Sequence, residues 1–97
     1  MRVIARKPLV QFSSEHSDAK AGLEAWYHEV KVAVWRSSAD IKAQYRSASV
    51  ISNSCVVFNI CGNKYRLVVQ INYPARIVYV RFVGTHKEYD RIDVENV

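Results

Sequence analysis

The sequence predicts an α+β fold with helices packed on one face of a small twisted antiparallel sheet. In the first half of the chain, apolar residues recur at spacings of three and four, which is typical of amphipathic helices. In the second half, three runs of β-branched and aromatic residues are separated by turn residues, which indicates strands. Helices followed by strands are typical of this class. The chain has 97 residues, enough for one core, so we expect a single domain over residues 1–97.

The first elements expected are a short strand over residues 2–5 and a helix over residues 8–16. Pro8 favours a helix start because its fixed φ suits the first turn, where its missing N–H is not needed. Leu9 and Phe12 then lie on the buried side of this helix, with Val10 as a further candidate for that side.

A longer helix is predicted from residue 19 to about residue 35, with Ser17 or Asp18 as its cap. Its apolar stripe should pack on the sheet and consists of Leu23, Trp26, Tyr27, Val30 and Val34. Residues 37–46 open with cap residues and form either one further short helix or a loop over the sheet edge. Trp26 and Trp35 are interpreted as packing residues.

Three strands are predicted over residues 56–60, 65–71 and 77–83. Gly62-Asn63 predicts a two-residue hairpin between the first two, because glycine tolerates a positive φ. Side chains alternate along a strand, so the middle strand has a polar and an apolar face. The polar face carries Lys64, Arg66, Gln70 and Asn72, and the apolar face carries Tyr65, Leu67, Val69 and Ile71. The apolar face needs a core, and the polar face is left for water or a polyanion.

The residues around the end of the third strand are the first candidates for chemistry. Arg81 interrupts an apolar run, and just beyond it the chain turns at Gly84 and presents His86, Tyr89 and Asp90. Cations beside an imidazole, a phenol and a carboxylate could form a catalytic cluster.

The net charge and the hydropathy of the sequence limit which binding partners and which cellular compartment we expect. Lysine and arginine number 14 against 9 acidic residues, which gives a formal charge of +5 and a pI near 9.4. This balance favours an acidic partner such as nucleic acid, and a basic protein without a polyanionic ligand is the alternative. No apolar run approaches the roughly 18 to 20 residues of a membrane span, and the first residues lack the apolar core of a signal peptide. We therefore expect a cytoplasmic protein with no membrane partner.

The two cysteines are not expected to form a disulfide. Cys55 and Cys61 lie six residues apart on one predicted strand. At about 3.3 Å per residue their Cα atoms would be about 20 Å apart, whereas a disulfide needs less than about 7 Å. We expect reduced, partly buried side chains and no metal site, since no matching His or Cys pair accompanies them.

Five motifs, taken in their joint order and spacing, carry a resemblance to a known family. They are Ala25-Trp26-Tyr27, Asp40-Ile41-Lys42-Ala43-Gln44-Tyr45, Gly62-Asn63-Lys64-Tyr65-Arg66-Leu67, Asn72-Tyr73 and Arg81-Phe82-Val83-Gly84-Thr85-His86-Lys87-Glu88-Tyr89-Asp90. The chain thereby resembles the HigB family of toxins from bacterial type II toxin–antitoxin systems, within the RelE-like group of mRNA interferases.

The resemblance implies a RelE-like fold and a ribosome-dependent endoribonuclease that cleaves translated mRNA without a metal or cofactor. It also implies a helix-turn-helix antitoxin of the HigA type that holds the enzyme inactive. Two positions depart from the family's usual pattern, in which a basic residue is common near Cys55 and a glycine near Arg76. A cysteine in place of a cation predicts weaker RNA binding, and the missing glycine leaves the conformation of the second hairpin open.

Metal-free cleavage of RNA assigns roles to the candidate residues, because the ribose 2′-hydroxyl must attack the adjacent phosphate. His86 is the expected proton shuttle, since an imidazole exchanges protons near neutral pH. Lys64, Arg66 and Arg81 would supply positive charge to the phosphate. The alternative for Lys64 and Arg66 is a solvated strand face, and for Arg81 it is a structural ion pair with Asp90 or Asp93.

The remaining candidates come from the tail, the turns and the loops. Tyr89 would stack on a base or donate a second proton, and Asp90 would orient His86, with tail packing or helix capping as the alternative for each. The expected RNA-binding residues are Tyr45, Arg46, Arg76 and Lys87. His16 and His28 are placed on helices away from the sheet and outside the catalytic group.

Two other functions remain open from the sequence. The same charges fit a non-catalytic RNA-binding module, and they also fit a protein-interaction domain whose basic face docks an acidic segment.

Overall fold

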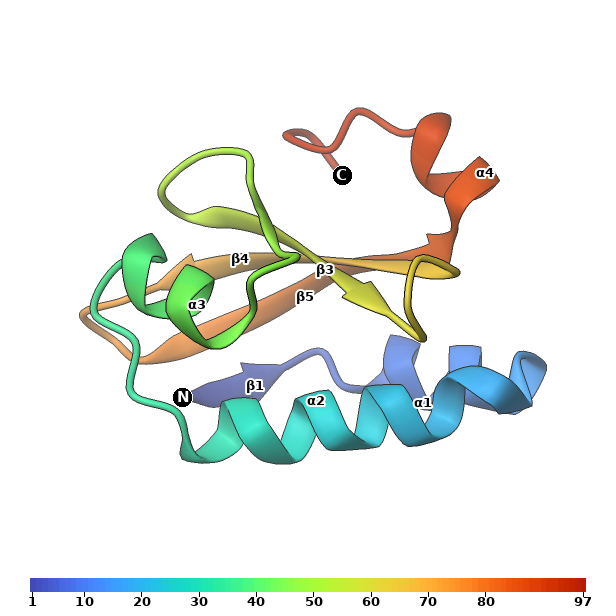
Figure 1. The fold of residues 1–97 in the computed structure, drawn as a ribbon, viewed down its shortest axis with the longest axis horizontal. Helices are drawn as coiled ribbons and strands as arrows, with labels where there is room; N and C mark the ends of the chain where they lie inside the picture. Colours follow the sequence, from blue (N-terminus) through green and yellow to red (C-terminus); the bar gives the residue numbers. More distant parts are fainter.

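The computed structural model describes residues 1–97 and shows a five-stranded sheet with helices on both sides (Figure 1). The elements in chain order are β1 (Arg2–Ile4), α1 (Lys7–Glu15), the 3-10 turn η1 (Ser17–Ala19), α2 (Lys20–Val32), α3 (Ser38–Gln44), β2 (Ser49–Val50), β3 (Cys55–Ile60), β4 (Tyr65–Asn72), β5 (Ile77–Thr85) and α4 (His86–Asp90). The expected α+β class is confirmed. No helix combines the length and the apolar character needed to cross a bilayer.

The strand order β1-β5-β4-β3-β2 departs from an all-antiparallel sheet in one place. β3, β4 and β5 form the predicted antiparallel meander, whereas β1 pairs with β5 in parallel, Arg2 opposite Ile77. A parallel pair requires a long crossover, and here the three helices and three strands between β1 and β5 provide it. β2 is a two-residue edge strand on β3 that the sequence pattern did not predict.

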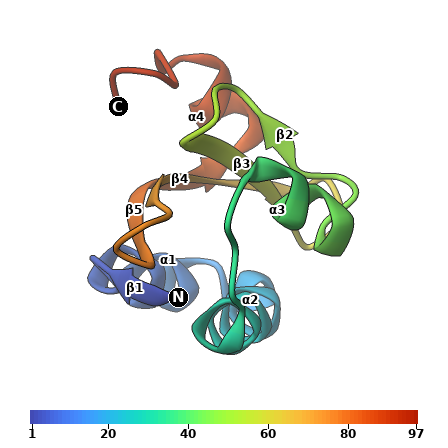
Figure 2. The same ribbon diagram turned by 90° about the vertical axis from the view of Figure 1, so that its left-hand side faces the viewer.

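The main core lies between the sheet and the helices α1, α2 and α3. Figure 2 shows α1 and α2 below the sheet and α3 beside its β3 edge. This core joins 19 buried residues, and the apolar face predicted for β4 belongs to it. α1 buries Leu9 and Phe12 as expected, whereas Val10 is 58% exposed. Residues 38–44 form a helix, which settles the choice left open between helix and loop.

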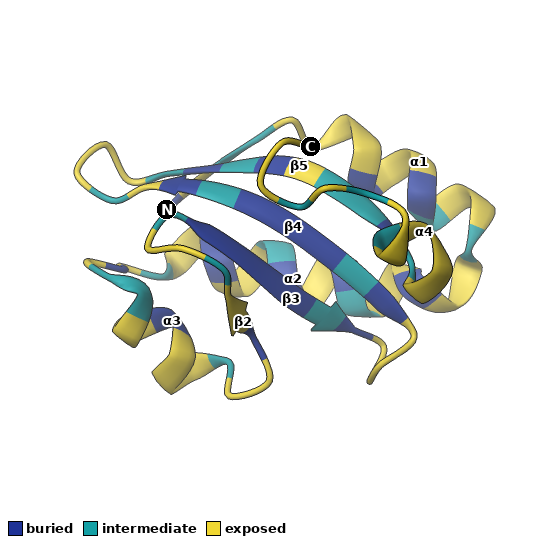
Figure 3. Ribbon diagram, turned by 90° about the horizontal axis from the view of Figure 1, so that it is seen from above, coloured by how far each residue is buried: buried dark blue, intermediate teal, exposed yellow.

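The opposite face of the sheet is partly covered, although the sequence pattern left it to water or a polyanion. α4 and the segment after it pass over this face (Figure 3). Tyr89, Ile92 and Val94 pack there against a small cluster of Cys55, Val57 and Val68. Burial of this apolar surface explains why the strands carry valines on both faces.

Helix α2 is shorter than its apolar periodicity predicted. It ends at Val32 because Ala33 adopts an extended backbone with ψ of 150°. Val34 therefore leaves the predicted stripe and is 56% exposed, whereas Trp35 still turns back into the core. Leu23, Trp26 and Val30 are buried as expected.

The two hairpin turns of the meander both use left-handed backbone. The first turn spans residues 61–64 rather than two residues, with Cys61 at φ 57° and Gly62 at φ 65°. It leaves Cys61 exposed at one end of β3 while Cys55 is buried at the other, and both thiols are free. In the second turn Arg76 has φ 58°, a conformation in which a side chain is disfavoured.

Replacement of Arg76 with glycine is expected to stabilise the fold by about 0.5 kcal/mol. Left-handed backbone costs an L-residue about 1–2 kcal/mol, whereas the extra chain entropy of glycine costs about 0.5–1 kcal/mol. Urea unfolding of the Arg76→Gly variant checks this, and Arg76→Ala, which keeps the Cβ, should show no gain. A destabilised glycine variant would mean that the guanidinium itself supports the turn.

Candidate active site

His86, Lys64 and Lys87 meet in an open hollow at one end of the sheet. Three segments that are distant in sequence line it: the junction of α1 and η1, the start of β4, and the junction of β5 and α4, all at the right-hand end of Figure 1. Its nine lining residues are Glu15, His16, Ser17, Asp18, Lys64, Tyr65, Thr85, His86 and Lys87. We call this depression the His86 hollow. Its volume of about 630 Å³ lies in the range of small-molecule sites, roughly 300–1,000 Å³.

A capping box fixes the position of His86 at the start of α4. The Thr85 N–H donates to Oε1 of Glu88 at 2.8 Å, and the Glu88 N–H donates to Oγ1 of Thr85 at 3.3 Å. This reciprocal pair satisfies two backbone donors at the helix start and sets where the helix begins. Gly84 allows the close approach, since a Cβ there would lie 2.6 Å from Cζ of Phe82 and 3.1 Å from Oε1 of Glu88.

Asp18 holds the other side of the hollow together. Its carboxylate accepts a hydrogen bond from Nζ of Lys64 and a second from the Tyr65 hydroxyl at 2.6 Å. The hydrogen bonds from Lys64 and Tyr65 lower the pKa of Asp18, and the bond to Asp18 raises the pKa values of Lys64 and Tyr65. The pair is exposed to solvent, with side-chain accessibilities of 59% for Lys64 and 43% for Asp18. Lys64 is therefore held at the hollow but free to exchange partners at small cost.

The sequence interpretation of Asp18 as a helix cap is wrong. Neither η1 nor α2 has a side-chain cap at its N-terminus. The 3-10 turn instead points the carboxylate toward the β4 end of the sheet, where Lys64 and Tyr65 bind it. Lys64 likewise does not project from the polar strand face, because it lies in the turn before β4.

The Asp18 carboxylate is expected to add a small acid-sensitive contribution to stability. Its pKa is lower in the folded protein than the usual 3.8, so the ionised form stabilises the fold above that pH. This stabilisation is lost as the pH falls through the folded pKa. We expect the urea midpoints of the wild type and Asp18→Asn to differ at pH 7, to begin to converge as the pH falls below 3.8, and to merge only below the lowered folded pKa. Glu24→Gln removes an exposed α2 carboxylate as a control, and a constant offset between wild type and Asp18→Asn at all pH values would contradict the assignment.

His16 lies in the hollow, although the sequence pattern placed it on a helix away from the sheet. α1 ends at Glu15, so His16 is the C-cap residue from which the chain turns toward the sheet. Its ring stacks on Phe12 with centroids 4.2 Å apart and meets the edge of Tyr65 at 5.4 Å. The expectation that His16 and the sheet are separate is therefore wrong. His28 is exposed on α2, as expected.

The two strand arginines lie beside the hollow rather than in it. Arg66 is opposite Gly84 in the sheet and donates from Nη1 to the Asn63 carbonyl at 3.4 Å. Arg81 lies at a β-bulge: Val69 pairs with Val80 and Val68 with Phe82, which leaves Arg81 without a partner residue. A bulged residue points out of the regular alternation, which explains how an arginine fits into an apolar run.

Arg81 forms no ion pair with Asp90 or Asp93, since Lys64 and Asp18 make the one salt bridge of the structure. Its guanidinium lies 5.6 Å from the centroid of the Tyr79 ring. It lines a neighbouring depression that shares Glu15 and His16 with the His86 hollow. Arg81 is thus within the same surface region but is separated from His86.

The tail residues divide between packing and the hollow. Tyr89 packs against the small cluster on the upper face of the sheet, as the packing alternative proposed. Asp90 is exposed at the end of α4 and makes no hydrogen bond to His86, so the structure does not bring this carboxylate to the imidazole. Lys87, in contrast, lines the hollow beside His86.

The other expected RNA-binding residues lie away from the hollow. The Tyr45 hydroxyl donates to Oε1 of Glu29 at 2.9 Å, and its ring packs edge-on against Phe58 with centroids 5.0 Å apart. Tyr45 is therefore a packing residue at the edge of the core. Burial and this hydrogen bond raise the pKa of Tyr45. Arg46 is exposed after α3, and Arg76 lies in the turn at the opposite end of β5 from His86.

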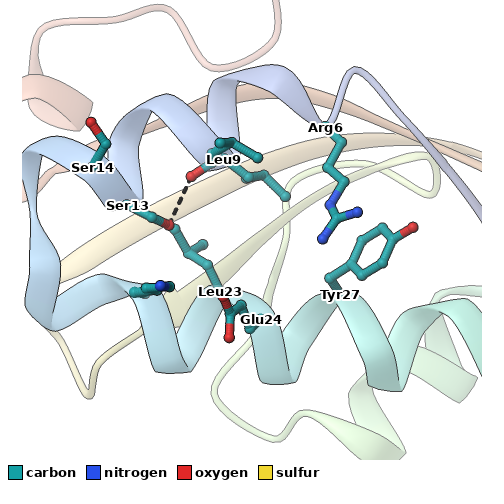
Figure 4. Close-up of a pocket in the computed structure, with 9 residues that line it drawn as sticks. Arg6, Leu9, Ser13, Ser14, Leu23, Glu24 and Tyr27 are labelled. Carbon is teal, nitrogen blue, oxygen red and sulfur yellow. Dashed lines mark hydrogen bonds between the residues drawn. The ribbon is translucent and has the colours of Figure 1, made fainter.

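A second pocket lies between α1 and α2 (Figure 4). It has a volume of about 250 Å³, with Leu9 and Leu23 at its base. The Arg6 guanidinium lies 4.0 Å from the centroid of the Tyr27 ring at one end. No histidine or cysteine lines this pocket, and it contains none of the predicted catalytic residues.

Comparison with known families defines the class of the protein. Residues 19–92 match the family HigB_toxin, described as the RelE-like toxic component of a toxin–antitoxin system. The fold described above is therefore that of a RelE-like toxin. More particularly, the chain belongs to the HigB toxin family.

Curated relatives cover nearly the whole chain. The mRNA interferase toxin HigB of Escherichia coli strain K12 is 28% identical over 92 residues, which cover 93% of this chain and 88% of the relative. The mRNA interferase HigB of Shigella flexneri shows the same identity and coverage. The mRNA interferase HigB of Escherichia coli O6:H1 is 19% identical over 94 residues, covering 95% of this chain and 91% of the relative.

Proposed function

We propose that this toxin is a cytoplasmic endoribonuclease that cleaves mRNA on the ribosome and is held inactive by a helix-turn-helix antitoxin of the HigA type. The observation that carries the proposal is the His86 hollow, where an imidazole and the ammonium groups of Lys64 and Lys87 share one solvent-open site. The relatives that span the chain are named mRNA interferases, which supports RNA as the substrate. The formal charge of +5 supports a polyanionic partner.

The hollow suits metal-free cleavage by the RNA's own 2′-hydroxyl. His86 exchanges a proton with the reacting oxygens, since its imidazole is exposed at the start of α4. Lys64 and Lys87 stabilise the negative charge that grows on the phosphorus oxygens. Lys64 passes from Asp18 to the phosphate, and the solvent exposure of that pair keeps the cost of the exchange small.

The arginines outside the hollow bind the flanking nucleic acid. Arg66 and Arg81 have no carboxylate partner and border the hollow from the sheet. Planar guanidinium groups bind phosphate through two parallel hydrogen bonds, which suits the neighbouring nucleotides of an extended strand. Arg46 and Arg76 are exposed on the remaining surface, where ribosomal RNA phosphates are the fitting partners.

Mapping of RNA ends tests the reaction. Purified toxin is added to translating ribosomes programmed with a reporter mRNA, and the new 5′ ends are sequenced. We expect fragments with 5′-hydroxyl ends and 2′,3′-cyclic phosphates, formed only when ribosomes are present. A matched mRNA with one 2′-deoxynucleotide at the cleaved position should stay intact there, because the nucleophile is missing. RNA binding without cleavage would instead indicate a non-catalytic RNA-binding module, and equal cleavage of naked mRNA would remove the ribosome from the proposal.

Co-expression tests the antitoxin. A neighbouring open reading frame that encodes a small helix-turn-helix protein should abolish growth arrest and co-purify with the toxin. A frame-shifted version of the same reading frame is the matched control. Unrelieved growth arrest with the intact neighbour would contradict the proposed pairing.

A further inference from the structure

We infer that His16 is a second catalytic imidazole. RNA cleavage needs two proton transfers, and His16 performs one of them while His86 performs the other. The inference rests on the proposed function and extends it to a residue outside the sequence-predicted cluster. His16 and His86 come from the α1–η1 junction and from α4, and both line the His86 hollow together with Lys64. Two imidazoles and an ammonium group around one solvent-open site can supply the base, the acid and the positive charge that a cyclising phosphodiester cleavage uses.

The ring of His16 is held, but its nitrogens are free. Stacking on Phe12 at 4.2 Å with an interplanar angle of 24°, and the edge contact with Tyr65, restrict its orientation. The hydrogen bonds of the hollow run from Lys64 and Tyr65 to Asp18 and between Thr85 and Glu88, and none of them involves an imidazole nitrogen. A fixed ring with unoccupied nitrogens is prepared to exchange a proton with a bound ligand.

The charged groups around His16 come from every element that borders it. In the hollow they are Glu15, Asp18, Lys64, Tyr65, His86 and Lys87. In the adjoining depression they are Arg81 and Glu88. Asp18 is already engaged by Lys64 and Tyr65, which leaves the two imidazoles as the proton-exchanging side chains of the hollow that form no hydrogen bond within the protein.

The reaction assigns one proton transfer to each imidazole. The neutral imidazole takes the proton from the ribose 2′-hydroxyl while the 2′-oxygen forms a bond to phosphorus. The bond from phosphorus to the 5′-oxygen breaks, and the other imidazole, initially protonated, gives its proton to that oxygen. The products are a 2′,3′-cyclic phosphate and a 5′-hydroxyl, and the two imidazoles have exchanged protonation states.

Two substitutions separate a catalytic from a structural role. His16→Gln removes the titrating group and keeps a polar side chain, whereas His16→Phe removes it but keeps an aromatic ring for the stack on Phe12. We expect both variants to lower the single-turnover cleavage rate on programmed ribosomes by about 10²- to 10⁴-fold. His28→Gln, on the exposed side of α2, is the matched control and should retain the wild-type rate. Recovery of activity in His16→Phe alone would assign His16 a packing role and overturn the inference.

The pH profile and a modified substrate provide the second readout. The wild-type rate should rise and fall with pH, and His16→Gln should lose one of the two limbs. An mRNA with sulfur in place of the bridging 5′-oxygen releases a thiolate that needs no proton. This substrate should restore the rate of only one of His16→Gln and His86→Gln, namely the variant that lacks the acid. Restoration of both or of neither, or an unchanged two-limbed profile, overturns the division of roles.

The wild-type protein separates the inference from the proposed function. If the wild type leaves ribosome-bound mRNA intact, the proposed function fails and the inference fails with it. If the wild type cleaves while both His16 variants cleave equally well, only the inference fails. Thermal melting of each variant tests whether the domain remains folded.

Discussion

Replacement of His86 with alanine is expected to lower the cleavage rate of ribosome-bound mRNA by about 10²- to 10⁴-fold, or ~3–5 kcal/mol in activation free energy. The imidazole lies at the start of α4 beside Lys87 and across the hollow from Lys64, where it can exchange a proton with the reacting RNA. The side chain is exposed and makes no contact with the core, so the fold should be retained. Single-turnover cleavage and the relief of growth arrest on expression measure the effect.

The control for this variant is His28→Ala on α2, which removes an exposed imidazole that does not line the hollow. It should remain as toxic as the wild type. The His86→Ala protein should still melt cooperatively and still bind its antitoxin. Full toxicity of a folded His86→Ala variant would refute the assigned role of the imidazole.

Replacement of Phe58 with alanine is expected to destabilise the fold by about 3–5 kcal/mol. Phe58 is 1% exposed on β3, and the rings of Trp26, Trp35 and Tyr45 pack around it at centroid distances of 5.5, 6.1 and 5.0 Å. Truncation removes the ring contacts of Phe58 with α2, with the segment between α2 and α3, and with the residue that follows α3, all at once. Since small domains have a total stability of about 5–15 kcal/mol, the loss removes a large fraction of it.

Urea unfolding at pH 7 measures this loss, and Val32→Ala provides the comparison. Val32 is 80% exposed at the end of α2, so its truncation should change stability by less than about 0.5 kcal/mol. Phe58→Leu keeps an apolar side chain, so its loss of stability should lie between those of Phe58→Ala and Val32→Ala. A Phe58→Ala protein as stable as Val32→Ala would show that the aromatic cluster repacks without a cavity.

The elements of the fold follow from local patterns, whereas their pairing across the chain does not. The meander β3-β4-β5 was predictable because alternation and turn residues lie within each hairpin. α1 and most of α2 were predictable from apolar spacing. The parallel contact of β1 with β5 was not predictable, because nothing in Arg2–Ile4 specifies a partner strand at residue 77. The end of α2 was missed because Ala33 carries no stop signal in its sequence.

The candidate site was predictable to the extent that its groups lie near one another in sequence or share a hairpin. Lys64 and His86 both line the hollow, since β4 and β5 bring the start of one and the end of the other together, whereas Arg66 and Arg81, which were predicted with them, lie beside it. His16 and Asp18 were missed, because their place depends on where α1 stops and how η1 turns. The sequence predicted a helix break at Ser17. Only the tertiary hydrogen bonds from Lys64 and Tyr65 show that this break directs the Asp18 carboxylate toward the sheet.

The pairing of β1 with β5 has a consequence for the timing of folding. Residues 2–4 can pair only after residues 77–79 are present, and the hollow also requires residues 85–87. The contacts that complete the fold therefore join residues that are far apart in sequence, which means a high contact order. Loop-closure entropy is lost before such contacts can form, which slows folding relative to a helical bundle. A nascent chain emerging from its ribosome at about 5–20 residues per second thus carries α1 and α2 long before it carries an assembled hollow. During synthesis, the hollow cannot assemble until α4 has emerged.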